Sequence, residues 1–175
     1  MTMWEQWLKP DLILGETILG LTPEIIAAQQ LQGLILDVDE TLVPLKENRV
    51  PASVAAWIEQ MRPLVTIWLV SNNLSNQRIS TIAESINVPY ILGARKPSRR
   101  KLIEAINRMQ LPKESVAMVG DRLFTDALAG NRLGVFTIWV EPMVDPAVAA
   151  ESYRLRNFEV WLTQRLGVSL ERSPQ

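Results

Sequence analysis

The sequence Leu34-Ile35-Leu36-Asp37-Val38-Asp39-Glu40-Thr41-Leu42 places two aspartates directly behind a short apolar run. The apolar run predicts a buried strand. Because side chains of an extended segment alternate between two faces, Asp37 and Asp39 should point to the same side while Val38 turns into the core. Carboxylates so close repel each other unless a cation lies between them or one is protonated, so the pair predicts a metal site, an acid-base pair, or both. A solvated acidic turn gives the same short pattern, and the motif alone decides little.

Four further apolar runs follow along the chain, at residues 65–70, 88–92, 116–119 and 135–140. Each predicts another buried strand. Helix-start signals lie in the segments between them, as at Pro51, Ser75 and Pro97. Strands that alternate with helices predict an α/β fold, a doubly wound, Rossmann-like parallel sheet covered on both faces.

Length and composition predict a single domain over residues 1–175. A hydrophobic fraction of 47%, a charged fraction of 21% and a net charge of -1 are typical of a globular domain of this size. We expect a catalytic core at about 33–141, an N-terminal extension over 1–32 and a C-terminal helix at about 147–166. In that helix Val148, Leu155, Phe158 and Leu162 predict one apolar face.

The chain contains neither cysteine nor histidine, which narrows its chemistry. Disulfides, thiol nucleophiles, Ser-His-Asp triads and histidine-based zinc sites are excluded. Carboxylates, hydroxyls, amides, lysine and arginine remain, and they suit a hard cation such as Mg²⁺. The balanced charge argues against nucleic acid as a partner. No apolar run approaches the roughly 20 residues that cross a bilayer, and Lys9 and Asp11 interrupt the N-terminal apolar segment, so we expect a cytoplasmic protein.

Polar residues also follow the second and fourth predicted strands. Ser71 and Asn72 come directly after residues 65–70, where a hydroxyl and backbone N–H groups suit phosphate oxygens; capping of the next helix is the simpler alternative. Gly120 closes the fourth strand and precedes Asp121 and Asp126, and a glycine there permits close backbone approach. The alternative is a turn with a capping aspartate. The carboxyl ends of the strands form the ligand crevice of a doubly wound sheet.

A basic run follows the third predicted strand. It comprises Arg95, Lys96, Arg99, Arg100 and Lys101. Such runs commonly form a solvated helix face. Lys96, however, lies between the strand end and a helix start, where a fixed ammonium group can neutralise phosphate charge. The other four residues are candidates for a rim that contacts the substrate.

In order and content the four motifs resemble those of the haloacid dehalogenase (HAD) superfamily. Residues 37–42 are similar to its first motif, Ser71 to its second, Lys96-Pro97 to its third and residues 120–126 to its fourth. Four such signals in the right order are specific where each alone is weak. The resemblance implies the HAD strand order 5-4-1-2-3, in which the first and fourth motifs meet at the switch point of the sheet. The flanking sequences 96–102, 120–126, 130–134 and 8–11 are similar to the YqeG family of subfamily IIIA, which includes phosphatidylglycerophosphate phosphatases.

The resemblance assigns a role to each motif residue. Asp37 would be the nucleophile that forms an aspartyl-phosphate, and Asp39 the general acid and base. Mg²⁺ would be held by the Asp37 carboxylate, the Asp39 backbone carbonyl and Asp121. Asp126 would orient Lys96 or a metal-bound water. The expected phosphate-binding residues are Thr41, Ser71, Asn72 and Lys96.

Two insertion points hold the cap domains of this superfamily, here between Thr41 and Pro51 and between Leu92 and Lys96. Both are too short for more than a hairpin, which predicts a capless site open to large or surface-bound substrates. The resemblance to YqeG implies the activity of a phosphatidylglycerophosphate phosphatase in phosphatidylglycerol synthesis, and an open site fits a lipid head group. Two alternatives remain: a capless phosphatase acting on phosphoprotein, nucleotide or polynucleotide ends, and a non-catalytic phosphate- or metal-binding module.

The predicted lipid substrate raises the question of membrane contact. Trp4, Trp7 and Leu8 recur at helical spacing near the N-terminus, and Trp161 lies near Arg165 at the other end. Tryptophan and arginine suit a membrane interface. Packing of both segments on the domain itself is the favoured alternative, because apolar stripes usually face a core. We expect a phospholipid head group as the substrate and a peripheral location on the inner membrane face.

Overall fold

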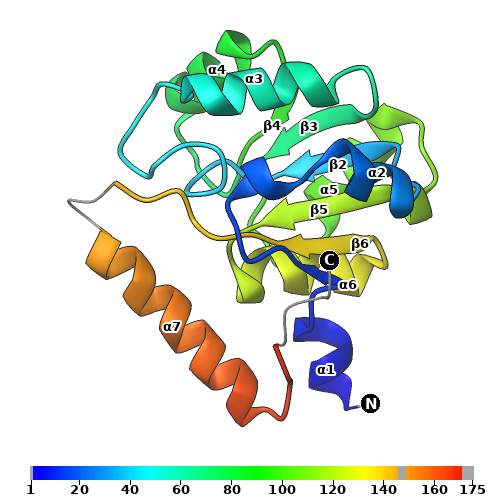
Figure 1. Ribbon diagram of the computed structural model, residues 1–175, viewed down its shortest axis with the longest axis vertical. Coiled ribbons are helices and arrows are strands. Elements are labelled where there is room, and N and C mark those ends of the chain that lie inside the picture. The colour runs from blue at the N-terminus through cyan, green and yellow to red at the C-terminus, as the bar shows by residue number, and fades with distance from the viewer. Residues whose placement is uncertain (1, 146–148, 171–175) are drawn as a thin grey trace.

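A computed structural model describes residues 2–145 and 149–170. Its centre is a six-stranded parallel sheet in the order β1-β6-β5-β2-β3-β4 (Figure 1). The strands are β1 Leu12–Ile13, β2 Gly33–Leu36, β3 Thr66–Val70, β4 Tyr90–Ile91, β5 Val116–Gly120 and β6 Phe136–Trp139. The five predicted strands are β2 to β6, so the doubly wound fold and the expected order of these strands are confirmed. The carboxyl ends of β2 and β5, which lie side by side, carry the first and fourth motifs.

The edge strand β1 was not predicted. It pairs with β6 in parallel, with Leu12 opposite Ile138. Asp11, just before β1, reinforces this edge: its Oδ2 accepts hydrogen bonds from the backbone N–H and the hydroxyl of Thr137, at 2.8 and 2.9 Å. The N-terminal extension is therefore part of the sheet.

Helices cover both faces of the sheet (Figure 1). Apolar side chains of α2 Pro23–Ala28, α3 Ala52–Met61 and α4 Asn76–Ser85 pack on one face, and those of α5 Arg100–Met109 and α6 Leu128–Leu133 on the other. Strand β2 contributes to both cores, because Leu34 and Leu36 point to the first face and Ile35 to the second. All three side chains are fully buried, as expected for a central parallel strand.

Most of the N-terminal apolar segment packs on the protein itself. It forms α1 Met3–Leu8 and the short 3-10 helix η1 Ile18–Gly20. Leu8, Ile18 and Leu21 are fully buried, and the indole N–H of Trp57 in α3 donates to the Leu21 carbonyl at 2.7 Å. Packing on the domain, the favoured expectation for this segment, is therefore confirmed for these residues. The Trp4 residue, in contrast, is 38% exposed to solvent.

Both insertion points are short loops. Residues 44–51, after the first motif, and residues 92–96, after β4, contain no helix or strand, so neither carries a cap. Two short helices lie next to β5: the 3-10 helix η2 Lys113–Ser115 before it and the π-helix η3 Leu123–Ala127 after it. Within the part of the chain that the structure describes, every helix is too short or too polar to cross a membrane.

The C-terminal helix, α7 Ala149–Arg165, turns part of its predicted apolar face to solvent. Leu155 and Phe158 of that face are 46% and 55% exposed, whereas Leu162 is half-buried. The buried side chains are instead Arg156, Glu159 and Thr163. The apolar spacing predicted the helix, but the surface beneath it offers charged and main-chain polar groups, so the polar stripe turns inward. Val148 of the predicted face lies outside the described residues, as does residue 147 of the predicted span.

Asp11→Ala should destabilise the β1 edge of the sheet. The substitution leaves the buried backbone N–H of Thr137 without its carboxylate acceptor. An unsatisfied buried donor costs about 1–3 kcal/mol, so the free energy of unfolding in urea should fall by about that amount. Lys46→Ala, at an exposed loop position, is the control and should change it by less than about 0.5 kcal/mol. Equal stability of the two variants would show that Asp11 does not secure this edge.

Candidate active site

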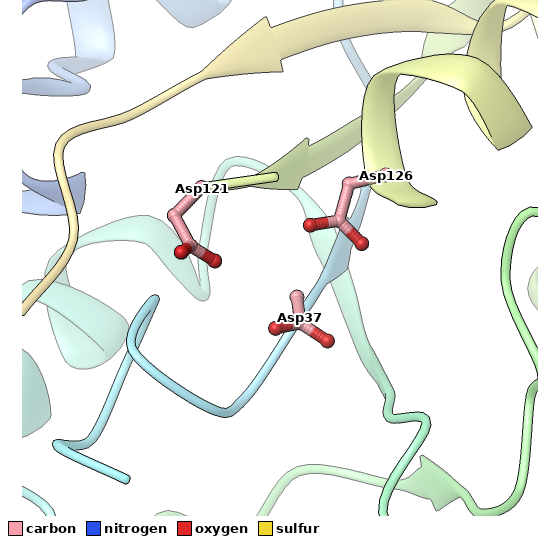
Figure 2. A group of neighbouring side chains, drawn as sticks. All are labelled: Asp37, Asp121 and Asp126. Atoms are coloured by element: carbon pink, nitrogen blue, oxygen red, sulfur yellow. The ribbon is translucent and has the colours of Figure 1, made fainter. Parts of the chain in front are cut away.

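Three aspartates meet at the carboxyl ends of β2 and β5 (Figure 2). Asp37 follows β2, Asp121 follows β5 and Asp126 lies in η3. One carboxylate oxygen from each lies within 4.8 Å of the others. The three residues are 7%, 2% and 2% exposed. Buried oxygen donors at this spacing can hold a hard metal ion.

Lys96 adds a positive charge to this group. Its ammonium nitrogen lies 2.5 Å from Asp37 Oδ1 and 2.7 Å from Asp126 Oδ1. The main chain of Lys96 is fixed by Asn72, whose amide accepts from the Lys96 N–H at 2.7 Å and donates to the Lys96 carbonyl at 3.2 Å. Asn72, predicted to bind phosphate, thus positions the lysine in this structure, and its contact with phosphate stays a prediction.

Gly120 allows Asp126 to approach the end of β5. A Cβ atom at position 120 would lie 2.2 Å from Asp126 Oδ2, a distance that no side chain tolerates. The same Oδ2 accepts a hydrogen bond from the backbone N–H of Arg122 at 3.2 Å. Glycine at this position is therefore required by the geometry that brings Asp126 to Lys96.

The buried charges shift the proton affinities of the site. Burial, together with the nearby Asp126, raises the pKa of Asp37 from 3.8 to about 7, although Lys96 opposes the shift. Burial and the carboxylates of Asp126 and Asp37 hold the pKa of Asp121 well above its usual value. For Lys96 burial lowers the pKa, but Asp126 and Asp37 outweigh burial and raise it. Lys96 is thus a permanent cation, whereas Asp37 and Asp121 need further positive charge nearby to ionise fully at neutral pH.

Asp39 binds partners outside the group of three aspartates. Its Oδ1 pairs with the guanidinium of Arg78 and its Oδ2 accepts from the Asn73 amide at 3.2 Å. Arg78 also donates to the carbonyls of Pro44 and Glu47, at 3.3 and 3.2 Å. Arg78 belongs to none of the predicted motifs. The available signal was its position in the first turn of the helix that Ser75 caps, which places it close to the end of β3.

Two hydroxyl groups named from the sequence lie at the same edge of the sheet. Thr41 is fully buried and its hydroxyl donates to Asp121 Oδ1 at 3.2 Å. Ser71 is also fully buried, and its Oγ accepts from the backbone N–H of Asn73 at 3.0 Å. The structure therefore brings Thr41 to an acidic residue of the site and gives Ser71 a role in the turn after β3. Phosphate binding by either hydroxyl stays a prediction.

The residues of the basic run have different surroundings in the structure. Arg95 is exposed, Arg99 donates to the Arg132 carbonyl at 3.0 Å, and Lys101 pairs with Glu104 of its own helix at 2.8 Å. A surface hollow on α5 is lined by Arg100, Ile103, Glu104, Asn107 and Arg108. Lys96 is thus the member of the run that reaches the aspartates, and contact of the other four with substrate stays a prediction.

Comparisons with known proteins identify the family. The model of the family described as mitochondrial PGP phosphatase matches residues 5–145. "Probable phosphatase YqeG" of Bacillus subtilis is 34% identical over 142 residues, which cover 81% of each protein. A chloroplastic phosphatidylglycerophosphate phosphatase 1 of Chlamydomonas reinhardtii is 25% identical over 155 residues, which cover 82% of this chain and 58% of that protein.

Solved structures share the fold at low sequence identity. A predicted HAD-like family hydrolase from Porphyromonas gingivalis is 12% identical and superposes with a TM-score of 0.53, over 73% of this chain and 98% of that chain. A 3-deoxy-D-manno-octulosonate 8-phosphate phosphatase from Moraxella catarrhalis, in complex with magnesium and phosphate ions, is also 12% identical, with a TM-score of 0.50 over 82% and 99% of the two chains. Together with the matched family, they confirm the resemblance to the HAD superfamily and to YqeG: the chain belongs to the mitochondrial PGP phosphatase family and is a phosphatase with the HAD-like hydrolase fold.

Proposed function

We propose that this phosphatase removes the terminal phosphate of phosphatidylglycerophosphate, with Mg²⁺ as cofactor and Asp37 as nucleophile. The observation that carries the chemistry is the buried group of Asp37, Asp121 and Asp126 beside Lys96. Carboxylate oxygens are the donors that Mg²⁺ prefers. With the Asp39 backbone carbonyl, Asp37 and Asp121 would hold the ion, whose charge stabilises the phosphoryl oxygens when it is bound.

Asp37 and Asp39 divide the reaction into two displacements. In the first, a carboxylate oxygen of Asp37 forms a bond to phosphorus, the bond to the lipid oxygen breaks, and Asp39 gives its proton to that oxygen. In the second, Asp39 takes a proton from water as the water oxygen bonds to phosphorus, and inorganic phosphate leaves Asp37. Lys96 would neutralise phosphoryl charge, with Asp126 holding its ammonium group in place. Thr41 and Ser71 would bind phosphate oxygens.

The open site supports a large, surface-bound substrate. Since neither insertion point carries a cap, a head group can reach Asp37 while its acyl chains stay in the bilayer. Helix α7 begins beside the site, where the Ser152 hydroxyl contacts the Glu40 carboxylate. Its outward face would rest on the membrane and would make the protein peripheral on the inner face.

The outward face of α7 has the chemistry of a membrane interface. Leu155, Phe158 and Trp161 are 46%, 55% and 51% exposed. The rings of Phe158 and Trp161 stack with their centroids 6.1 Å apart. The guanidinium of Arg165 lies 5.6 Å from the centroid of the Trp161 ring. Arg154 is also exposed on this helix. Aromatic rings beside arginines suit the headgroup region of an anionic leaflet.

Asp37→Asn should abolish turnover, because an amide keeps the size of the carboxylate and loses its nucleophilic charge. We expect a loss of at least about 10³-fold for Asp37→Asn and of about 10²–10⁴-fold for Asp39→Asn, measured as phosphate release from the best substrate. Glu84→Gln, at an exposed site on α4, is the control and should keep full activity. Near wild-type turnover by Asp37→Asn would refute the covalent mechanism.

Metal binding should depend on pH through the raised pKa values of Asp37 and Asp121. In the metal-free protein the folded state binds more protons than the unfolded state, so its stability should fall as pH rises from about 4 to about 7. Bound Mg²⁺ requires both carboxylates ionised, so the gain in melting temperature on adding MgCl₂ should increase over that range. Calorimetry at about pH 6.5 should detect proton release on binding. Asp121→Asn should remove the gain, and a gain independent of pH would contradict the assignment.

The substrate proposal predicts a strong preference for a membrane surface. Hydrolysis of phosphatidylglycerophosphate in anionic vesicles should exceed that of glycerol phosphate and should decline as salt rises. Neutralising Arg99, Arg100 and Lys101 should lower the rate on vesicles further, because each charge near the surface contributes up to about 1 kcal/mol to membrane binding. Faster hydrolysis of a nucleotide or phosphopeptide, with no response to vesicles, would favour the alternative capless phosphatase.

The role of α7 is tested separately with Phe158→Ser and Trp161→Ser. Each removes an aromatic side chain that would be buried in the interface, so activity on vesicles should drop about tenfold or more. Activity on p-nitrophenyl phosphate in solution should be unchanged. Leu64→Ser removes an apolar side chain that is 47% exposed just after α3 and serves as the matched control. An equal effect of all three substitutions on vesicle activity would exclude α7 as the contact surface.

A further inference from the structure

The inward face of α7 contacts the loop that carries two of the three clustered aspartates. This loop, residues 120–126, runs from the end of β5 through Asp121 into η3, where Asp126 lies. Two charged side chains of α7 reach it, Arg156 and Glu159, and both are at least 94% buried. Burying charged groups is unfavourable unless each finds good partners. Their partners here are main-chain and side-chain groups of the site loops.

Arg156 binds the main chain of the metal-site residue Asp121. One terminal nitrogen lies 3.1 Å from the Asp121 carbonyl oxygen and 3.2 Å from that of Val140, and the other lies 2.8 Å from Glu141 Oε1. The guanidinium carbon is 3.9 Å from the ring centroid of Trp139. The indole N–H of Trp139 donates to the same Asp121 carbonyl at 2.8 Å. Two donors on rigid elements therefore fix the peptide group that follows Asp121.

Glu159 binds the next part of the loop. Its Oε1 accepts from Arg122 Nε and Nη2 at 3.0 and 2.7 Å, and its Oε2 accepts from the backbone N–H of Leu123 at 3.1 Å. Leu123 is the first residue of η3, so the carboxylate satisfies one of the free N–H groups at the start of that helix. Asp126 lies in the same turn. The position of Glu159 therefore bears on how Asp126 meets Lys96.

We propose that Arg156 and Glu159 are positioning residues that hold Asp121 and Asp126 in the geometry of the metal site. The inference rests on the proposed metal-dependent function. Asp37, Asp121 and Asp126 repel one another, so a loop held only by its own turn would relax and separate them. An apolar helix face would pack as well but would not direct the carbonyl and N–H groups of the loop. Groups that orient metal ligands typically change metal affinity by about 10–100-fold when they are removed.

The experiment measures Mg²⁺ binding by isothermal titration calorimetry on the full-length protein, alongside turnover of p-nitrophenyl phosphate as a function of Mg²⁺ concentration. Arg156→Met removes all three hydrogen bonds of the guanidinium. Arg156→Lys keeps the charge but has a single nitrogen in place of the two with which Arg156 binds Asp121, Val140 and Glu141. Glu159→Gln keeps one acceptor and loses the charge. Asn157→Met changes an exposed position of the same helix and is the matched control.

We expect Arg156→Met to weaken Mg²⁺ binding by about 10–100-fold, with smaller losses for Arg156→Lys and Glu159→Gln and none for Asn157→Met. Excess Mg²⁺ should restore much of the turnover, because the reacting groups are unchanged. A purely structural role would lower the melting temperature and leave the Mg²⁺ affinity of the folded protein unchanged. If Arg156→Met does not fold, the Mg²⁺ affinities of Arg156→Lys and Glu159→Gln test the inference in its place.

Unchanged Mg²⁺ affinity in the folded Arg156 and Glu159 variants would overturn the inference. Asp121→Asn separates this failure from a failure of the proposed function. If the wild-type protein binds Mg²⁺ and Asp121→Asn does not, the metal site stands and only the role of α7 is refuted. If the wild-type protein binds no Mg²⁺ by calorimetry, both the metal site and the role of α7 are refuted.

Discussion

Lys96 lies between Asp37 and Asp126, with its ammonium nitrogen 2.5 and 2.7 Å from their oxygens, and Asp121 completes the buried group. One ammonium group thus carries a single positive charge beside three buried carboxylates. Burial, together with the neighbouring carboxylates, raises the pKa values of Asp37 and Asp121. The site therefore takes up either protons or another cation. The proposed mechanism would use this property, because the cation that favours ionised Asp37 and Asp121 would also neutralise charge on the phosphate.

Holding like charges together places demands on the fold around them. The apolar strand β2 anchors Asp37 from a fully buried stretch, and β5, its neighbour, delivers Asp121 at the same edge of the sheet. Gly120 leaves room for Asp126, and Asn72 fixes the main chain of Lys96. Each of these groups restrains one partner in a cluster that would otherwise move apart. Part of the stability supplied by the apolar core thus offsets the repulsion stored at the site.

The sequence was sufficient where the physical signal is local. Five strands and the doubly wound fold follow from apolar runs separated by helix signals, and the aspartates follow from their places at strand ends. Strand β1 gave no comparable signal, because two residues are too few to show a period. Arg78 was missed because its partner Asp39 is 39 positions away, and one sequence carries no record of such a contact. The direction in which the apolar face of α7 points could not be predicted, because spacing reveals which residues share a face and not what that face meets.

The loops on which α7 packs explain why its buried side chains are polar. At the carboxyl edge of the sheet the chain presents carbonyl and N–H groups of residues 121–123 and 140, and each needs a partner. An apolar helix face laid over them would leave those groups unsatisfied, so Arg156 and Glu159 must face inward. Leu155, Phe158 and Trp161 then face outward, beside a site that no cap covers, while Val160 packs against the buried cluster around Trp139. The need to satisfy the site loops therefore also creates the apolar surface through which, as proposed, the enzyme meets the membrane that holds its substrate.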